Sequence, residues 1–318
     1  MDKYLNIRYL KNEDINFVKW DNCINNAYNG SIYAFSWYLN IICERWDAIV
    51  KDDYSTVMPV LPNKTGPFFY SYNSIFAPRL GVFSTEILRE EVVNEFLDKL
   101  STVYKVFNVN LNKYNKVKPA FFKQKSKIVY ECDLIETYDR FRKKYHADVN
   151  VALEEARKNK ISVIKNVKPN EFLNLISSEH VLTSYTVKKN DLTNLRRIIA
   201  FVYRHGIGEI YVAYNSYNEL CAACLFLKSN RKSNLIFSAI TREGLNMQAM
   251  HYLIDHYIKK HTGQTLTLNF ENINIPEKEK FCKGFGAGAY FYINVQHENL
   301  TFPQNILFRL LKLVEGRR

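Results

Sequence analysis

The chain has 318 residues, which is more than one ordinary hydrophobic core and enough for two domains. Its hydrophobic content of 47% excludes a disordered protein. The chain has no run of 18 apolar residues, so no transmembrane helix is predicted. A formal charge of +12 favours polyanionic ligands, but the lysines are spread along the chain, so the charge alone selects no partner.

The first 134 residues alternate short strand patterns with helix patterns. Residues 85–100 repeat apolar side chains with helical spacing, which predicts an amphipathic helix. Ser36 stands at the entry of a helical stretch, so we expect it to cap that helix. The other predicted elements of this half are a helix at residues 14–22 and strands at residues 3–10, 46–50, 56–61, 106–111 and 127–134.

A charged helical stretch at residues 138–160 marks a shift in composition. We therefore predict an N-terminal domain of residues 1–145 and a C-terminal domain of residues 146–318. The last amphipathic helix, residues 302–314, is the segment of the second domain that could pack back on the first. The remaining predicted elements are strands at residues 161–165, 209–214, 220–228, 233–240, 266–271 and 290–296, and helices at residues 169–177, 191–205 and 246–261.

The two halves share an order of elements: helices, an antiparallel hairpin, another helix, a strand and a closing strand. This order predicts a mixed α/β (α+β) protein made of two similar halves, and not a Rossmann fold. The chain has no GxGxxG motif, no P-loop motif and no GxSxG motif. Their absence argues against dinucleotide, P-loop and serine-hydrolase chemistry.

Cysteine usage and the N-terminal residues predict a cytoplasmic protein. The six cysteines are scattered, and no cationic segment followed by an apolar one suggests a secretory signal. Cys221 and Cys224 have CxxC spacing inside an apolar strand, where their sulfur atoms would point to opposite faces. We therefore expect buried free thiols and no metal site.

A polar cluster follows the strand predicted at residues 266–271. Its apolar residues alternate with polar ones, and the strand ends on Asn269, Glu271 and Asn272. A buried strand that delivers a carboxylate and amides to its C-terminal end is a common site architecture in α/β folds. An ordinary polar strand cap is the alternative interpretation.

Several segments resemble the GNAT superfamily of acyltransferases. Residues 220–227 (LCAACLFL) look like the strand after its hairpin, and residues 237–255 look like its acyl-carrier strand and helix. Residues 268–272 (LNFEN), with residues 285–287 (FGA), resemble the DFEGS…FYxxFGA signature of Fem-type members. Residues 30–39 (GSIYAFSWYL) are similar to the sequence segment gsiFqspeWl of the same family.

The resemblance implies two tandem GNAT-like domains, each a mixed, largely antiparallel sheet flanked by helices. It further implies transfer of an acyl group from acyl-CoA or aminoacyl-tRNA to an amine, by direct attack and without a permanently bound cofactor. Both donors carry phosphate groups, and the acceptor would be the amine of a cell-envelope precursor or small metabolite.

Three positions depart from the family pattern. Asn269 replaces the signature aspartate, and Cys282 stands where transferases of tRNA-charged residues carry a lysine. The pyrophosphate loop is reduced to residues 242–249 with the single glycine Gly244. The reduced loop weakens the coenzyme A interpretation, although amides at a helix N-terminus could still bind phosphate.

Acyl transfer to an amine needs a base, donors for the oxyanion and orientation of both substrates. Glu271 is the candidate base, with a capping or surface carboxylate as the alternative. Tyr252 and Tyr290 are candidate donors to the oxyanion or to the leaving group, with core or rim tyrosines as the alternative.

Two sets of candidate binding residues complete the prediction. The resemblance assigns the donor to Ala239, Thr241, Gly244, Asn246 and Gln248, with backbone amides at a helix start near Asn246. The candidate substrate-binding residues are Trp37, Arg79, Asn269, Asn272, Phe281 and Lys283. For Arg79, a bidentate anion contact competes with a solvated loop arginine.

Two other classes of function stay open. One is a Fem-like scaffold without catalysis that acts as a binding module, which the replaced residues suggest. In that case side chains such as Phe270 and Tyr252 would fill the cleft between the splayed strands. The other is an RNA-binding protein, which the charge run at residues 140–144 suggests.

Overall fold

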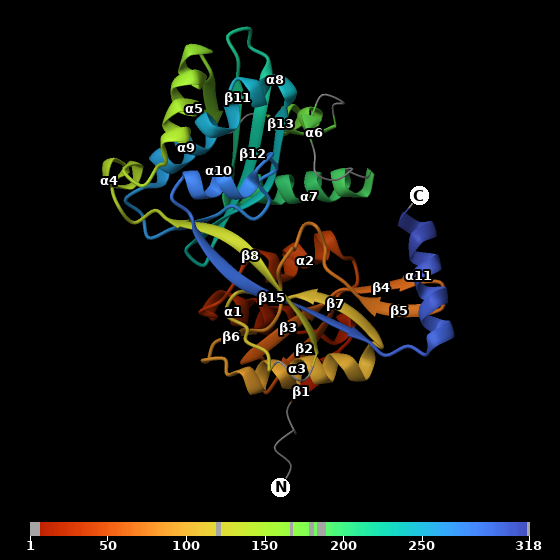
Figure 1. The fold of residues 1–318 in the computed structure, drawn as a ribbon. Helices are drawn as coiled ribbons and strands as arrows, with labels where there is room; N and C mark the ends of the chain where they lie inside the picture. Colours follow the sequence, from red (N-terminus) through yellow and green to blue (C-terminus); the bar gives the residue numbers. More distant parts are fainter. Residues whose placement is uncertain (1–6, 119–121, 166–167, 178–180, 183–188, 317–318) are drawn as a thin grey trace. The chain divides into compact units, whose positions relative to one another are not determined.

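The computed structural model describes residues 7–118, 122–165, 168–177, 181–182 and 189–316. It divides into two compact units, coloured by sequence in Figure 1. Unit 1 contains Met1–Ile128 and Phe291–Arg318, and unit 2 contains Val129–Tyr290. The strand predicted at residues 3–10 is therefore seen from Ile7 on, and residues 3–6 lie outside the described residues.

Two sheets form the framework of unit 1. The first is antiparallel, with the strand order β1-β2-β3-β6, and its register pairs Asp47 with Val60 and Lys51 with Thr56. Its strands are β1 (Ile7–Leu10), β2 (Asp47–Lys51), β3 (Thr56–Val60) and β6 (Phe83–Ser84). The strands of the second are β4 (Pro62–Thr65), β5 (Phe68–Ser71), β7 (Val106–Asn110) and the unit 1 part of β15 (Gly288–Glu298).

The helices of unit 1 are α1 (Phe17–Asn26), α2 (Ser36–Ile42), α3 (Glu90–Val103) and α11 (Phe302–Gly316). The core of the unit forms where the apolar face of α3 packs on β2, β3 and β7. On α11, the buried Phe308 packs edge-on against Phe68 and Tyr70. The predicted cap is wrong: Phe35 is the cap residue, and the Ser36 hydroxyl donates to Asp21 instead.

In unit 2, six strands of the larger, 11-stranded sheet follow one another in the order β8-β14-β13-β12-β11-β9. Only β13 and β14 pair in parallel, and the other neighbours are antiparallel. The short strand β10 (Val181–Leu182) adds to β13. The strands of this part of the sheet are β8 (Lys123–Asp133), β9 (Ser162–Lys165), β11 (Gly208–Tyr214), β12 (Leu220–Ser229), β13 (Lys232–Thr241) and β14 (Thr267–Asn269).

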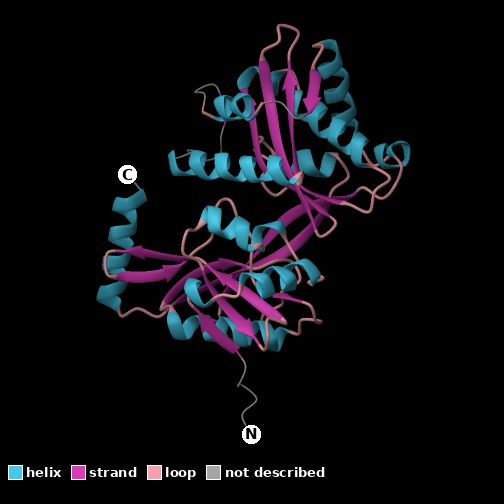
Figure 2. Ribbon diagram, turned by 180° about the vertical axis from the view of Figure 1, so that it is seen from behind, coloured by secondary structure: helices cyan, strands magenta, loops and turns pink. Residues whose placement is uncertain are grey.

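Helices cover both faces of this part of the sheet, as Figure 2 shows. On one face, α5 and α9 enclose the main core with α10, and α6 and α7 pack on the other. The helices are α4 (Tyr138–Arg142), α5 (Ala147–Lys158), α6 (Pro169–Ile176), α7 (Lys189–His205), α8 (Arg242–Asn246), α9 (Ala249–His261) and α10 (Lys278–Gly284). Cys221 and Cys224 are buried free thiols in β12, as the sequence predicted.

The unit boundaries differ from the predicted division at residue 145. The chain passes between the units inside two long strands, β8 and β15, each of 11 residues. The charged stretch that suggested a junction instead supplies α4 and α5, which are covering helices of unit 2. A change in composition there reflects solvent exposure of helices, and not a boundary.

A partly buried ion cluster joins four elements of unit 2. The Glu209 carboxylate of β11 lies 2.5 Å from the Lys165 ammonium, 3.1 Å from that of Lys228 and 2.9 Å from Nε2 of His261. Burial alone would raise the pKa of Glu209. Hydrogen bonds from His261, Lys165 and Lys228 outweigh burial and hold the pKa well below its usual range.

Because of this cluster, we expect the free energy of unfolding of unit 2 to depend on pH in the acidic range. Because the pKa of Glu209 is lower in the folded state, its contribution is complete above the unfolded pKa of about 4.3. That contribution is lost as the pH falls through the lower folded value. Glu209→Gln is therefore expected to destabilise the protein at pH 7, with the difference from wild type shrinking below about pH 4.

Urea unfolding between pH 7 and pH 3 measures this difference, and Glu154→Gln, at an exposed position of α5, is the control. A difference between wild type and Glu209→Gln that stays constant across this range would contradict the assignment.

Candidate functional site

The candidate site lies where β14 separates from β13. The two strands pair in parallel only from Lys232–Thr267 to Asn234–Asn269, and then β14 ends. The chain that follows continues along β13 in the same direction and stays hydrogen-bonded to it. The predicted cluster of Asn269, Glu271 and Asn272 is built on the turn that begins this segment.

Asn272 and Asn274 attach the turn to β13. The Asn272 amide donates to the Ile236 carbonyl at 2.9 Å, and the Asn272 carbonyl accepts from the Ser238 hydroxyl at 3.0 Å. The Asn274 N–H donates to the same hydroxyl at 2.7 Å. Beyond this point β10 pairs with the last residues of β13. The edge of β13 is therefore occupied by β14, by this turn and by β10.

The backbone of Glu271 is held from two sides. Its N–H donates to Oδ1 of Asn269 at 2.9 Å, and its carbonyl accepts from the Lys278 ammonium. Asn269 is itself buried and donates to Oδ1 of Asn234 at 3.4 Å. Glu271 is half-buried. Fixing the backbone on both sides of a half-buried carboxylate orients that side chain at the end of β14.

The lysine at this strand end was not identified from the sequence. Lys278 begins α10, and Cys282 follows it four residues later, on the same helix face. The ammonium group therefore comes from one helical turn before the position where the family resemblance places it. The i, i+4 spacing of Lys278 and Cys282 is the signal that could have pointed to it.

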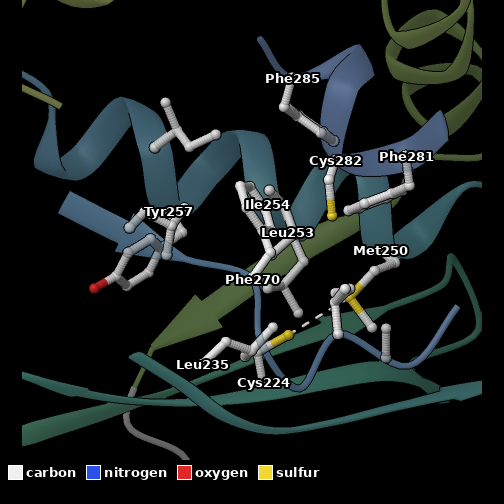
Figure 3. Packing of buried hydrophobic residues seen from close by; sticks show 14 of the residues in the cluster. Cys224, Leu235, Met250, Leu253, Ile254, Tyr257, Phe270, Phe281, Cys282 and Phe285 are labelled. Atoms are coloured by element: carbon white, nitrogen blue, oxygen red, sulfur yellow. Dashed lines mark hydrogen bonds between the residues drawn. The ribbon is translucent and has the colours of Figure 1, made fainter. Parts of the chain in front are cut away.

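Cys282 is a core residue. It is fully buried, and Figure 3 shows its thiol among Phe270, Phe281 and Met250. Burial raises the pKa of the Cys282 thiol to about 12, so the thiol is protonated and unreactive at neutral pH. Lys283 points elsewhere: its ammonium pairs with Glu279 at 2.6 Å on the exposed side of α10.

Phe281 belongs to the aromatic core beneath the strand end. Its ring centre lies 4.6 Å from that of His251, 5.1 Å from that of Phe285 and 6.4 Å from that of Phe270. It also lines a cavity beside α5 and α9. The packed rings give α10 a fixed position, and this fixes Lys278 at the end of β14.

The residues assigned to the donor lie along β13, α8 and the start of α9. Ala239 is buried in β13, and the Thr241 hydroxyl caps α8 by accepting from the Gly244 N–H at 2.9 Å. Asn246 is the last residue of α8, and α9 begins only at Ala249. The prediction that a helix starts at Asn246 is therefore wrong, because the left-handed backbone of Gln248 (φ 58°) separates two helices.

The two candidate tyrosines lie on α9 and β15. Tyr252 lies on α9 and lines a cavity of about 210 Å³ with Tyr138 and Asp255. Asp255 accepts from the Tyr138 hydroxyl at 2.8 Å and from the Tyr145 hydroxyl at 2.9 Å. Tyr290 lies on β15 and is 40% exposed.

Trp37 and Arg79 belong to unit 1. Trp37, on α2, contacts Tyr38 edge-on at 5.3 Å between ring centres. Arg79 is 7% exposed, and its guanidinium group lies 5.3 Å from the ring centre of Tyr292. Arg79 is thus buried, and the alternative of a solvated loop arginine is wrong.

FemX is similar to this chain along nearly its whole length, with a TM-score of 0.60 and 12% sequence identity over 93% of this chain and 98% of FemX. The chain has a FemX-like fold. L-PGS from Bacillus licheniformis is also similar, with a TM-score of 0.51 and 12% identity over 88% of this chain and 92% of L-PGS.

A third similar structure is the C-terminal domain of a putative lysylphosphatidylglycerol synthetase from Agrobacterium fabrum. Its TM-score is 0.50 and its identity 7%, over 94% of this chain and 96% of that domain. No protein-family model matches the chain, and no curated protein matches it in sequence. The predicted fold class, a mixed α/β protein, is confirmed, and its fold is similar to that of FemX.

The helices of the described residues include none with the length and apolar character needed to cross a bilayer.

Proposed function

We propose that the chain is an N-acyltransferase that moves an acyl or aminoacyl group to an acceptor amine by direct attack. The observation that carries this proposal is the convergence of Glu271 and Lys278 at the end of β14 in a FemX-like fold. The name of one similar structure, a lysylphosphatidylglycerol synthetase, supports transfer of an aminoacyl group.

Each residue has a defined part in this reaction. The acceptor nitrogen attacks the carbonyl carbon, a C–N bond forms, and the bond from that carbon to the oxygen or sulfur of the carrier breaks. Glu271 takes the proton that the nitrogen loses. The ammonium of Lys278, next to the Glu271 backbone, supplies positive charge for the oxyanion of the tetrahedral intermediate.

The occupied edge of β13 favours aminoacyl-tRNA over acyl-CoA as the donor. An extended acyl carrier that adds to β13 as a strand would have to displace the Asn272 turn or β10. An aminoacyl ester at the end of an RNA needs no such strand addition. The acceptor that we propose for testing is the amine of a cell-envelope precursor, in the cytoplasm where charged tRNA is available.

The occupied edge of β13 also favours a second candidate function, a binding module without catalysis. Phe270 is fully buried in the main core, and the half-buried Tyr252 packs against that core. This candidate retains the fold but requires no turnover. It differs from the transferase in one measurable respect: Lys278 would matter for stability and not for acyl transfer.

A thermal-shift titration with charged tRNA, uncharged tRNA, coenzyme A and acetyl-CoA tests the proposal. A donor present at about 100 times its Kd stabilises the folded protein by about 2.7 kcal/mol, which raises Tm by a few degrees. We expect this shift with charged tRNA. Release of the aminoacyl group to a lysine-containing acceptor is then measured with wild type, Lys278→Met and Lys283→Met.

Lys278→Met is expected to slow release by about 10²- to 10³-fold, because one charge donor to the oxyanion is lost. Lys283→Met is the matched control, since Lys283 lies on the same helix and pairs with Glu279. Equal rates for the two variants would refute the role of Lys278. No shift with any donor would favour the binding module.

A further inference from the structure

A second cavity in unit 2 has a chemistry that the transfer proposal does not use. It has a volume of about 590 Å³ and lies between α5, α9, α10 and the segment before α10; we call it the α5–α9–α10 cavity. Its lining is mostly apolar and includes Val149, Leu245, Ile275 and Phe281. A cavity of this size and composition accommodates an apolar chain of several carbon atoms.

The charged residues of the lining are mainly acidic. Asp148, Glu155 and Glu277 contribute three carboxylates, and Lys280 contributes one ammonium, which gives a formal charge of −2. The whole chain carries +12, so its overall field repels cations. Any attraction for a cation must therefore be local to this cavity.

The chain already places an alkylammonium group at the rim. The ammonium of Lys280 lies 3.2 Å from Asp148 and 3.9 Å from Glu277. All three side chains are exposed: the exposed fraction is 67% for Lys280, 69% for Asp148 and 73% for Glu277. Such exposed ion pairs are weak, so the Lys280 side chain can leave and another ammonium can take its place.

The lining of the cavity also includes an imidazole ring. His251, on α9, contributes this ring, which contacts Phe281 at an interplanar angle of 55°. Burial lowers the pKa of His251 to about 4, so its ring is neutral at pH 7 and adds no positive charge. A neutral imidazole has one acceptor nitrogen, which can accept a hydrogen bond from an ammonium.

We propose that the α5–α9–α10 cavity binds a primary alkylammonium group carried on an apolar chain. The carboxylates of Asp148 and Glu277 hold the ammonium in exchange for Lys280, and the apolar wall covers the methylene groups. Two sources share this chemistry: a free polyamine and a lysine side chain. The binding does not depend on acyl transfer, so its failure would leave the role of Lys278 untouched.

The test measures binding to the full chain by saturation-transfer NMR and titration calorimetry. The probes are cadaverine for the polyamine source and N-acetyl-lysine methylamide for the lysine source, with 1,5-pentanediol as the uncharged control. We expect at least one of the two amines to bind and the diol not to bind. Equal binding of the diol, or binding of neither amine, would overturn the proposal.

Two substitutions with opposite expected effects locate the site. Glu277→Gln is expected to weaken amine binding about two- to fivefold, and Lys280→Met to strengthen it by a similar factor, because it removes the competing ammonium. Glu279→Gln is the matched control, since Glu279 is two residues from Glu277 but does not line the cavity.

Thermal unfolding of each variant separates loss of binding from loss of fold. Equal weakening by Glu277→Gln and Glu279→Gln would show only general surface attraction, and would overturn the site. No gain with Lys280→Met would likewise overturn the exchange between Lys280 and the bound amine.

Discussion

Replacement of Glu271 by glutamine is expected to lower the rate of acyl transfer by about 10²- to 10⁴-fold, the usual contribution of a general base. Glutamine keeps the shape of the side chain and the backbone contacts to Asn269 and Lys278, but it cannot take a proton at neutral pH. The measurement is single-turnover aminoacyl transfer with the donor that the thermal-shift titration selects.

Glu279→Gln serves as the control for this experiment, because Glu279 is an exposed carboxylate on α10 that pairs only weakly with Lys283. We expect it to keep the wild-type rate. A Glu271→Gln protein with unchanged turnover would rule out Glu271 as the base and leave a binding role at this strand end.

Replacement of Phe270 by alanine is expected to destabilise unit 2 by about 3–5 kcal/mol, the usual cost of removing a buried phenylalanine. Phe270 is fully buried, and its ring centre lies 6.4 Å from those of Phe281, on α10, and of Phe285, directly after α10 (Figure 3). The empty volume would loosen α10, and with it Lys278. Urea unfolding followed by circular dichroism gives the free energy of unfolding.

Phe69→Ala is the control, since Phe69 is 61% exposed and belongs to unit 1. Its expected effect is below about 1 kcal/mol, as for most surface substitutions. A similarly small effect of Phe270→Ala would mean that the aromatic core does not hold α10 in place.

Local patterns predicted most strands of both units. The hairpin expected at residues 209–214 and 220–228 is β11 and β12, because alternating apolar residues around a polar turn define a strand pair locally. Helix starts were less predictable. Gln248 interrupts the helix expected at residues 246–261, and the Ser36 hydroxyl bonds to Asp21 instead of capping its own helix.

The candidate site was predictable in part. Asn269, Glu271 and Asn272 are neighbours in sequence, so their common position at a strand end follows from the strand alone. Lys278 depends on where α10 begins. The closing of the β13 edge by Asn272 and by β10 depends on pairing between segments far apart in sequence, which local periodicity does not reveal.

The insertion of unit 2 between the two parts of unit 1 determines the order in which the protein can fold during synthesis. Asn110 of β7 pairs with Asn294 of β15, which leaves the ribosome 184 residues later. At about 5–20 residues per second, β7 waits roughly 10 to 40 s for its partner. All of Val129–Tyr290 is made in that interval, so unit 2 can fold while the nascent unit 1 still exposes an unpaired strand edge to chaperones and to other chains.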